Sequence, residues 1–97
     1  MVRAIWNGVV LAESKKTEIV EGNHYFPPES INKAYFKDSI SHTTCPWKGM
    51  ASYYTLAVNG DSLRDGAWYY PNPRDAAKNI RDHVAFYRSK GVTVVNE

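Results

Sequence analysis

The chain has almost no cysteine and no strong excess of charge. It contains one cysteine among 97 residues, so it can form no internal disulfide and has too few thiols for a cysteine-based zinc site. Twelve lysines and arginines against ten aspartates and glutamates leave a formal net charge of +2. Nucleic-acid binding needs basic residues concentrated in a patch, so this balance predicts no nucleic-acid partner.

Long apolar runs are also missing. No stretch approaches the roughly 20 residues that cross a bilayer, and the N-terminal residues lack the apolar core of a secretory signal. No low-complexity segment, long linker or repeat divides the chain. We therefore expect a single cytoplasmic domain over residues 1–97, with no membrane partner and one modest core.

Turn-forming residues divide the N-terminal half into short strands. Asn7-Gly8 separates two apolar runs, and Asn-Gly most readily adopts the two positive φ angles of a type I′ turn. A second hairpin is expected around Gly22-Asn23. Pro27-Pro28 ends it because neither proline donates a backbone hydrogen bond, and a short helical turn is expected near residues 30–35.

The C-terminal half is predicted as a hairpin followed by a helix. Residues 51–58 and 64–70 form the strands, and their turn begins at Asn59-Gly60. One helix is expected to cover the sheet near residues 73–83, with Asn72 as its N-cap. The expected fold is mostly β, an α+β arrangement of compact antiparallel sheets with one covering helix.

Strand parity gathers aromatic rings on one face of this hairpin. Opposed residues of an antiparallel pair share a face, so an even-length loop places Tyr53 with Trp68 and Tyr70. Of the thirteen aromatic residues, ten lie between Tyr25 and Tyr70. Core packing is the simpler role for any one ring, but a core this small can hardly hide both faces of the hairpin. Some rings are therefore expected to line a concave surface.

The most site-like segment is Thr43-Thr44-Cys45-Pro46-Trp47-Lys48-Gly49. Trp47 and Lys48 are either a stacking surface and an anchor for an anionic ligand, or a buried indole that pins the loop beside a solvated lysine. Cys45 is either a reactive thiol whose pKa Lys48 lowers, or a small packed hydrophobe. If Cys45 reacts, His42 and His83 are the candidates for proton transfer.

Four motifs follow one another in a characteristic order over nearly the whole chain. They are Tyr25-Phe26-Pro27, Cys45 to Tyr54, Trp68-Tyr69-Tyr70-Pro71-Asn72-Pro73, and Val84-Ala85-Phe86-Tyr87. This order resembles the bacterial domain-of-unknown-function family numbered 427. The resemblance implies a small, β-rich, tent-like fold with a cleft near the Cys-Pro-Trp-Lys-Gly loop. Where the family often has Gly-Tyr before Val84, this chain has Asp82-His83.

Members of that family sometimes carry a nucleotidyltransferase label, which the carboxylates of this chain do not support. Metal-dependent nucleotidyl transfer needs closely placed carboxylates that hold Mg²⁺ against phosphate oxygens. Asp61 and Asp65 flank a turn, Asp75 and Asp82 lie on the expected helix, and no Asp-x-Asp pair occurs. The histidines lack the spacing of a local metal motif, so we predict no metal and no other cofactor.

The leading functional prediction is a non-catalytic module that binds a small molecule or peptide in an aromatic cleft. The predicted ligand-binding residues are Tyr25, Cys45, Trp47, Lys48, Tyr53, Trp68 and Tyr70. One alternative is a small enzyme that uses Cys45 as nucleophile or redox centre. Another is a protein-interaction domain that uses the same aromatic surface, including self-association into a homo-oligomer.

Overall fold

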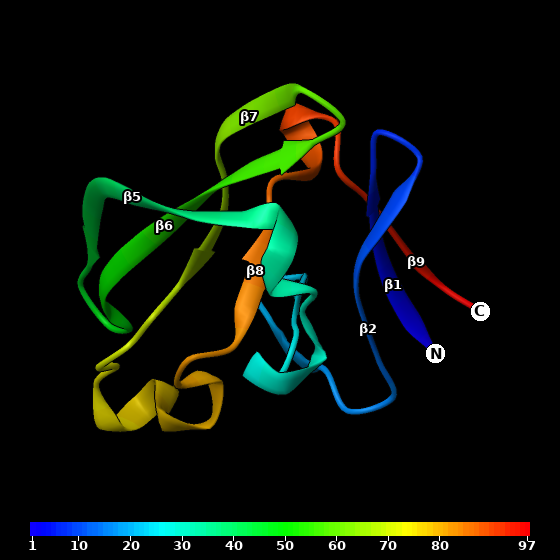
Figure 1. The fold of residues 1–97 in the computed structure, drawn as a ribbon. Helices are drawn as coiled ribbons and strands as arrows, with labels where there is room; N and C mark the ends of the chain where they lie inside the picture. The colour runs from blue at the N-terminus through cyan, green and yellow to red at the C-terminus, as the bar shows by residue number, and fades with distance from the viewer.

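Strands make up most of the computed structural model, which describes all of residues 1–97 (Figure 1). The strands are β1 (Val2–Trp6), β2 (Val9–Ser14), β3 (Glu18–Val20), β4 (Asn23–Tyr25), β5 (Phe36–Cys45), β6 (Gly49–Val58), β7 (Asp61–Tyr69), β8 (Val84–Phe86) and β9 (Thr93–Asn96). They form three antiparallel sheets, ordered β2-β1-β9, β3-β4 and β5-β6-β7-β8. The prediction of a mostly β fold with antiparallel sheets is confirmed.

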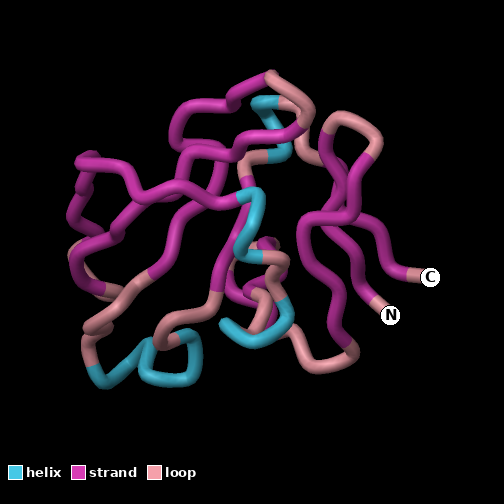
Figure 2. The backbone as a smooth tube through the Cα atoms, in the orientation of Figure 1, coloured by secondary structure: helices cyan, strands magenta, loops and turns pink.

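Helical structure is limited to four 3-10 segments, which connect strands (Figure 2). They are η1 (Pro28–Ser30), η2 (Lys33–Tyr35), η3 (Asp75–Ile80) and η4 (Arg88–Lys90). The helical turn expected near residues 30–35 corresponds to η1 and η2. No helical segment is long and apolar enough to cross a membrane.

The helix expected near residues 73–83 is shorter and more irregular than predicted. It is the 3-10 segment η3, interrupted at Ala77, where φ is −121°. Arg74, and not Asn72, occupies the N-cap position, and no side chain caps this end. The backbone N–H of Asp82 donates to the carbonyl of Tyr70 at 3.0 Å. Because this bond returns the chain to the end of β7, a regular helix cannot continue through residue 83.

Two-residue turns join the strands of three hairpins. Asn7-Gly8 joins β1 to β2, and Asn59-Gly60 joins β6 to β7, each with positive φ at both positions, as the sequence predicts. In the β3-β4 hairpin the turn is Glu21-Gly22, with φ of 53° and 77°. This turn lies one residue earlier than expected, so Asn23 becomes the first residue of β4.

Two clusters of buried side chains lie in the fold. The larger cluster packs the β2-β1-β9 sheet against the four-stranded sheet and includes Leu11, Phe26 and Leu56. The smaller one includes Tyr25, Tyr53, Tyr70, Ala77, Ile80 and Ala85, with Trp68 and Tyr87 packed against it. Phe26 and Val84 exchange two backbone hydrogen bonds of 2.8 Å, which tie the β3-β4 hairpin to the four-stranded sheet. These bonds hold Tyr25, the residue before Phe26, within the smaller cluster.

Candidate ligand-binding site

A cavity of about 270 Å³ opens beside the smaller cluster, between β4, β6 and β7. We call it the aromatic cavity. Its lining residues are Glu21, Asn23, Tyr25, Thr43, Lys48, Tyr53, Trp68, Tyr70 and Tyr87. Five of the seven residues that the sequence singled out for ligand binding are among them. Residues from four separate strands therefore meet around one hollow.

The β6-β7 register explains how the central rings come together. Tyr53 and Trp68 are directly opposed across the two strands. A bulge between Tyr54 and Leu56 adds two residues to β7, and an even insertion keeps side chains on their original faces. The parity predicted from the sequence is therefore correct for Tyr53 and Trp68, and Tyr70 follows directly after the end of β7.

Ring contacts fix the shape of the cavity. The Trp68 indole packs edge to face on Tyr25, with 6.1 Å between centroids, and its N–H donates to the Tyr25 hydroxyl at 3.1 Å. The centroid of the Trp68 ring also lies 4.5 Å from that of the Tyr87 ring. Tyr87 stacks nearly parallel to Tyr53, and their hydroxyl oxygens are 3.5 Å apart. Because each ring is held by another, the walls are preorganised for a ligand.

Lys48 is the one buried charged side chain of the site and is only 6% exposed. Its ammonium forms an ion pair with the carboxylate of Glu21 and lies 4.9 Å from the Trp47 ring centroid and 5.8 Å from that of Tyr70. Burial is the largest single influence and opposes the charged form, but the hydrogen bond that Lys48 donates to Glu21 and the attraction of nearby acidic groups together outweigh it, so the pKa of Lys48 is raised. Lys48 therefore carries its charge at neutral pH, and Glu21 balances it.

The Glu21–Lys48 pair is expected to make the protein sensitive to acid. The hydrogen bond from Lys48 lowers the pKa of Glu21 below its ordinary value of about 4.5. A lowered folded-state pKa means that the stabilisation is present at neutral pH and is lost as the pH falls below about 4.5 and through the folded-state pKa. Wild type should therefore melt at a higher temperature than Glu21→Gln at pH 7, and the two curves should converge in acid.

Glu29→Gln is the matched control for this experiment, because Glu29 is exposed and takes part in no ion pair. Its melting temperature should follow that of wild type across the range. A difference between wild type and Glu21→Gln that persists undiminished at low pH would contradict the ion pair.

Three tyrosine hydroxyls of the cavity, those of Tyr25, Tyr70 and Tyr87, are shifted toward their neutral form. Burial raises the pKa of Tyr70 and of Tyr25, and burial together with the hydrogen bond to Tyr53 raises that of Tyr87. The Tyr53 hydroxyl is also 2.7 Å from the Thr43 hydroxyl. Neutral hydroxyls can both donate and accept hydrogen bonds. The cavity thus offers aromatic faces and hydroxyls, and its one full positive charge is already balanced.

Trp47 and Cys45 do not line the cavity, although the sequence grouped them with it. Trp47 is 40% exposed and covers the outer side of the Lys48 ammonium. Cys45 is half-buried and faces Gly49 across the β5-β6 turn. Burial is the largest single influence and opposes the thiolate, but hydrogen bonds from the backbone N–H groups of Lys48 and Trp47, together with the charge of Lys48, outweigh it, so the pKa of Cys45 is lowered.

The structure does not bring the predicted proton-transfer residues to Cys45. His42 is three residues from Cys45 along β5, and alternation places the two side chains on opposite faces of the sheet. The His42 ring lies 3.3 Å from the Ser52 hydroxyl, and the His83 ring lies 2.9 Å from the carbonyl of Arg81. The geometry therefore contains no Cys–His pair, and no three His, Cys, Asp or Glu side chains cluster as metal ligands would.

The Cys45 thiol is expected to ionise more readily in the folded protein than in the unfolded chain. The backbone N–H groups at Trp47 and Lys48 stabilise the thiolate only while the turn is intact. The pH midpoint of reaction with a thiol reagent should therefore be lower for the native protein than for the same protein in urea. An equal or higher midpoint in the native state would show that the turn does not activate the thiol.

Four lining residues lay outside the predicted set: Glu21, Asn23, Thr43 and Tyr87. Thr43 and Tyr87 do belong to the segments that the sequence singled out, but nothing showed that their side chains face the cavity. The sequence places Glu21 and Asn23 in a hairpin and gives no sign that either lines a cavity. The pairing of Glu21 with Lys48, 27 residues away, depends on the way the β3-β4 hairpin folds over the sheet.

Comparison with protein-family models identifies the family of this chain. The family model described as a domain of unknown function, DUF427, matches residues 1–97, which is the whole chain. The chain therefore belongs to this family, as its motifs indicated. No match was found among curated proteins.

Proposed function

We propose that this member of the DUF427 family binds a small planar molecule in the aromatic cavity. The observation that carries the proposal is the convergence of Tyr25, Tyr53, Trp68 and Tyr70 on one hollow together with the buried Lys48. Ligand sites are typically concave and apolar, with a few polar groups that fix orientation. This combination supports recognition and requires no acid–base pair.

The size of the cavity limits the ligand. A volume of about 270 Å³ is near the lower end for small-molecule pockets, so one aromatic ring with short substituents fills it. In the proposed complex the ring packs against Trp68 and Tyr87. A polar substituent hydrogen-bonds to the hydroxyl of Tyr70 or to the Lys48 ammonium.

A screen of single-ring fragments tests this proposal. Binding should raise the melting temperature, because a ligand that binds only the folded state stabilises it by mass action. In ¹⁵N-labelled protein the indole N–H resonance of Trp68 should shift on binding, while that of Trp6 should not. If aromatic fragments cause neither stabilisation nor a shift at Trp68, the cavity is no binding site for them.

A thiol-based reaction is the second candidate, favoured by the lowered pKa of Cys45 at the edge of the site. Cys45→Ser separates the two candidates. The variant should bind fragments as wild type does if the protein is a binding module. If the variant still binds fragments but loses a catalytic activity that wild type shows, that activity depends on the thiol.

A further inference from the structure

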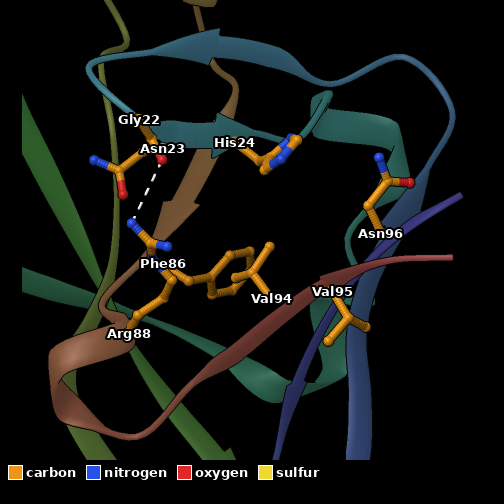
Figure 3. A pocket seen from close by; sticks show the side chains of 8 residues that line it. All are labelled: Gly22, Asn23, His24, Phe86, Arg88, Val94, Val95 and Asn96. Carbon is orange, nitrogen blue, oxygen red and sulfur yellow. Dashed lines mark hydrogen bonds between the residues drawn. The ribbon is translucent and has the colours of Figure 1, made fainter.

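Two more hollows continue the aromatic cavity across the surface. The middle one has a volume of about 330 Å³ and lies beside Trp68, Tyr87 and Arg88. The outer one, of about 200 Å³, lies between β4 and β9 (Figure 3). Phe86 and Val94 are among its apolar lining residues, and its polar side chains are those of Asn23, His24, Arg88 and Asn96.

Shared lining residues make these three hollows one trough. Asn23 lines all of them. Trp68 and Tyr87 are common to the aromatic cavity and the middle hollow, and Phe86 and Arg88 are common to the middle and outer hollows. A molecule that fills the aromatic cavity can therefore extend past Asn23 toward Arg88 without leaving the trough.

The two ends of the trough differ in charge. At the aromatic end the ammonium of Lys48 is balanced by Glu21. In the middle and outer hollows Arg88 is the only Lys, Arg, Asp or Glu among the lining residues. Arg88 takes part in no ion pair. The positive charge at this end is therefore unbalanced by any lining carboxylate.

The Arg88 guanidinium uses few of its hydrogen-bond donors. The side chain of Arg88 makes one hydrogen bond, which it donates to the carbonyl oxygen of Gly22 at 3.4 Å. This is the only hydrogen bond drawn among the residues of Figure 3. A guanidinium carries five N–H donors in a planar fork that matches a carboxylate or a phosphate. Most of these donors remain free for a ligand at the outer end of the trough.

We propose that the ligand of this trough is an aromatic compound with an anionic group, a carboxylate or a phosphate, which Arg88 binds. This inference rests on the proposed function, since the ring occupies the aromatic cavity. The linker between ring and anion passes the amide of Asn23 and packs over Phe86. An anion is favoured at this end because it meets an unpaired guanidinium and no carboxylate.

Matched pairs of ligands test the role of Arg88. The first pair is 3-phenylpropionate and its neutral amide, and the second is 2-phenylethyl phosphate and 2-phenylethanol. Wild type should bind each anion about tenfold more tightly than its neutral partner, as one charge-assisted hydrogen bond provides. Arg88→Gln should lose this preference while it binds the neutral compounds as before. A preference in only one pair identifies the carboxylate or the phosphate as the group recognised.

Arg64→Gln is the control, because it removes the same charge from an exposed residue that lines none of the hollows. It should keep the preference for anions. The role proposed for Arg88 is wrong if wild type binds both members of each pair equally, or if Arg88→Gln keeps the preference for anions. Either result leaves the proposal of an aromatic ligand in the cavity unchanged. If none of the four compounds binds, the proposed function fails and this inference fails with it.

Discussion

Trp68→Ala is expected to weaken binding of aromatic fragments about 100-fold. The indole forms one wall of the aromatic cavity and holds the rings of Tyr25 and Tyr87 in place. Loss of an aromatic contact surface and of ring packing together costs about 2–4 kcal/mol, and each 1.4 kcal/mol is a factor of ten in affinity. Titration calorimetry with the tightest fragment of the screen measures the change.

Trp47→Ala is the matched control, since this indole is 40% exposed and lies outside the cavity. It should change the affinity by less than about threefold, which corresponds to a small surface effect. Trp68→Phe provides a second test in case the alanine variant is poorly folded. It keeps a ring but loses the N–H donor to Tyr25, so binding should weaken by a smaller factor. Equal effects of Trp47→Ala and Trp68→Ala would contradict the placement of the site.

Phe26→Ala is expected to cause the largest loss of stability, about 3–5 kcal/mol, as for other fully buried phenylalanines. Phe26 is completely buried, packs edge to face on Phe86, and is bridged by two backbone hydrogen bonds to Val84. A domain is typically stable by only about 5–15 kcal/mol in total. The β3-β4 hairpin should therefore detach readily, and fragment binding at Tyr25 should be lost with it. Urea denaturation measures the free energy of unfolding.

Ile19→Ala is the control on the same hairpin. Ile19 is 65% exposed, so its truncation should change the free energy of unfolding by no more than about 0.5 kcal/mol. Similar losses for the two variants would mean that the contact of Phe26 with Phe86 does not anchor the hairpin.

Local signals in the sequence predicted the hairpins well. Asn7-Gly8 and Asn59-Gly60 adopt the backbone that their residue types favour, and Asn59-Gly60 pairs Val58 with Asp61. The bulge between Tyr54 and Leu56 shifts this register by two residues, which no local signal predicts, but the even shift leaves Tyr53 and Trp68 on one face. The shared face of these two rings could therefore be predicted from parity, whereas their direct pairing could not.

The strand β5 could not be predicted in this way. It is ten residues long and forms the edge of the four-stranded sheet, with mostly exposed or half-buried side chains. Ile40, its one aliphatic residue, is 93% exposed, so no apolar alternation marks the strand. Its pairing with β6 is a tertiary effect. The irregular η3 likewise depends on the bond between Asp82 and Tyr70, which lie on either side of η3 in the sequence.

The rest of the site depends on contacts between distant segments. Glu21 reaches Lys48 because a type I′ turn positions it, and Tyr87 stacks on Tyr53 because β8 pairs with β7. Neither contact leaves a local pattern in the sequence. Conversely, Trp47 and Cys45 are close to Lys48 in sequence, yet they lie outside the cavity. Proximity along the chain was a weaker guide to the site than strand parity.

A crystal structure of the protein with the tightest fragment bound tests the central claim most directly. The account predicts planar density in the aromatic cavity, packed against the rings of Trp68 and Tyr87, with a polar atom within hydrogen-bond distance of Tyr70 or Lys48. A fragment bound elsewhere on the molecule, with only ordered water in this cavity, would contradict the account.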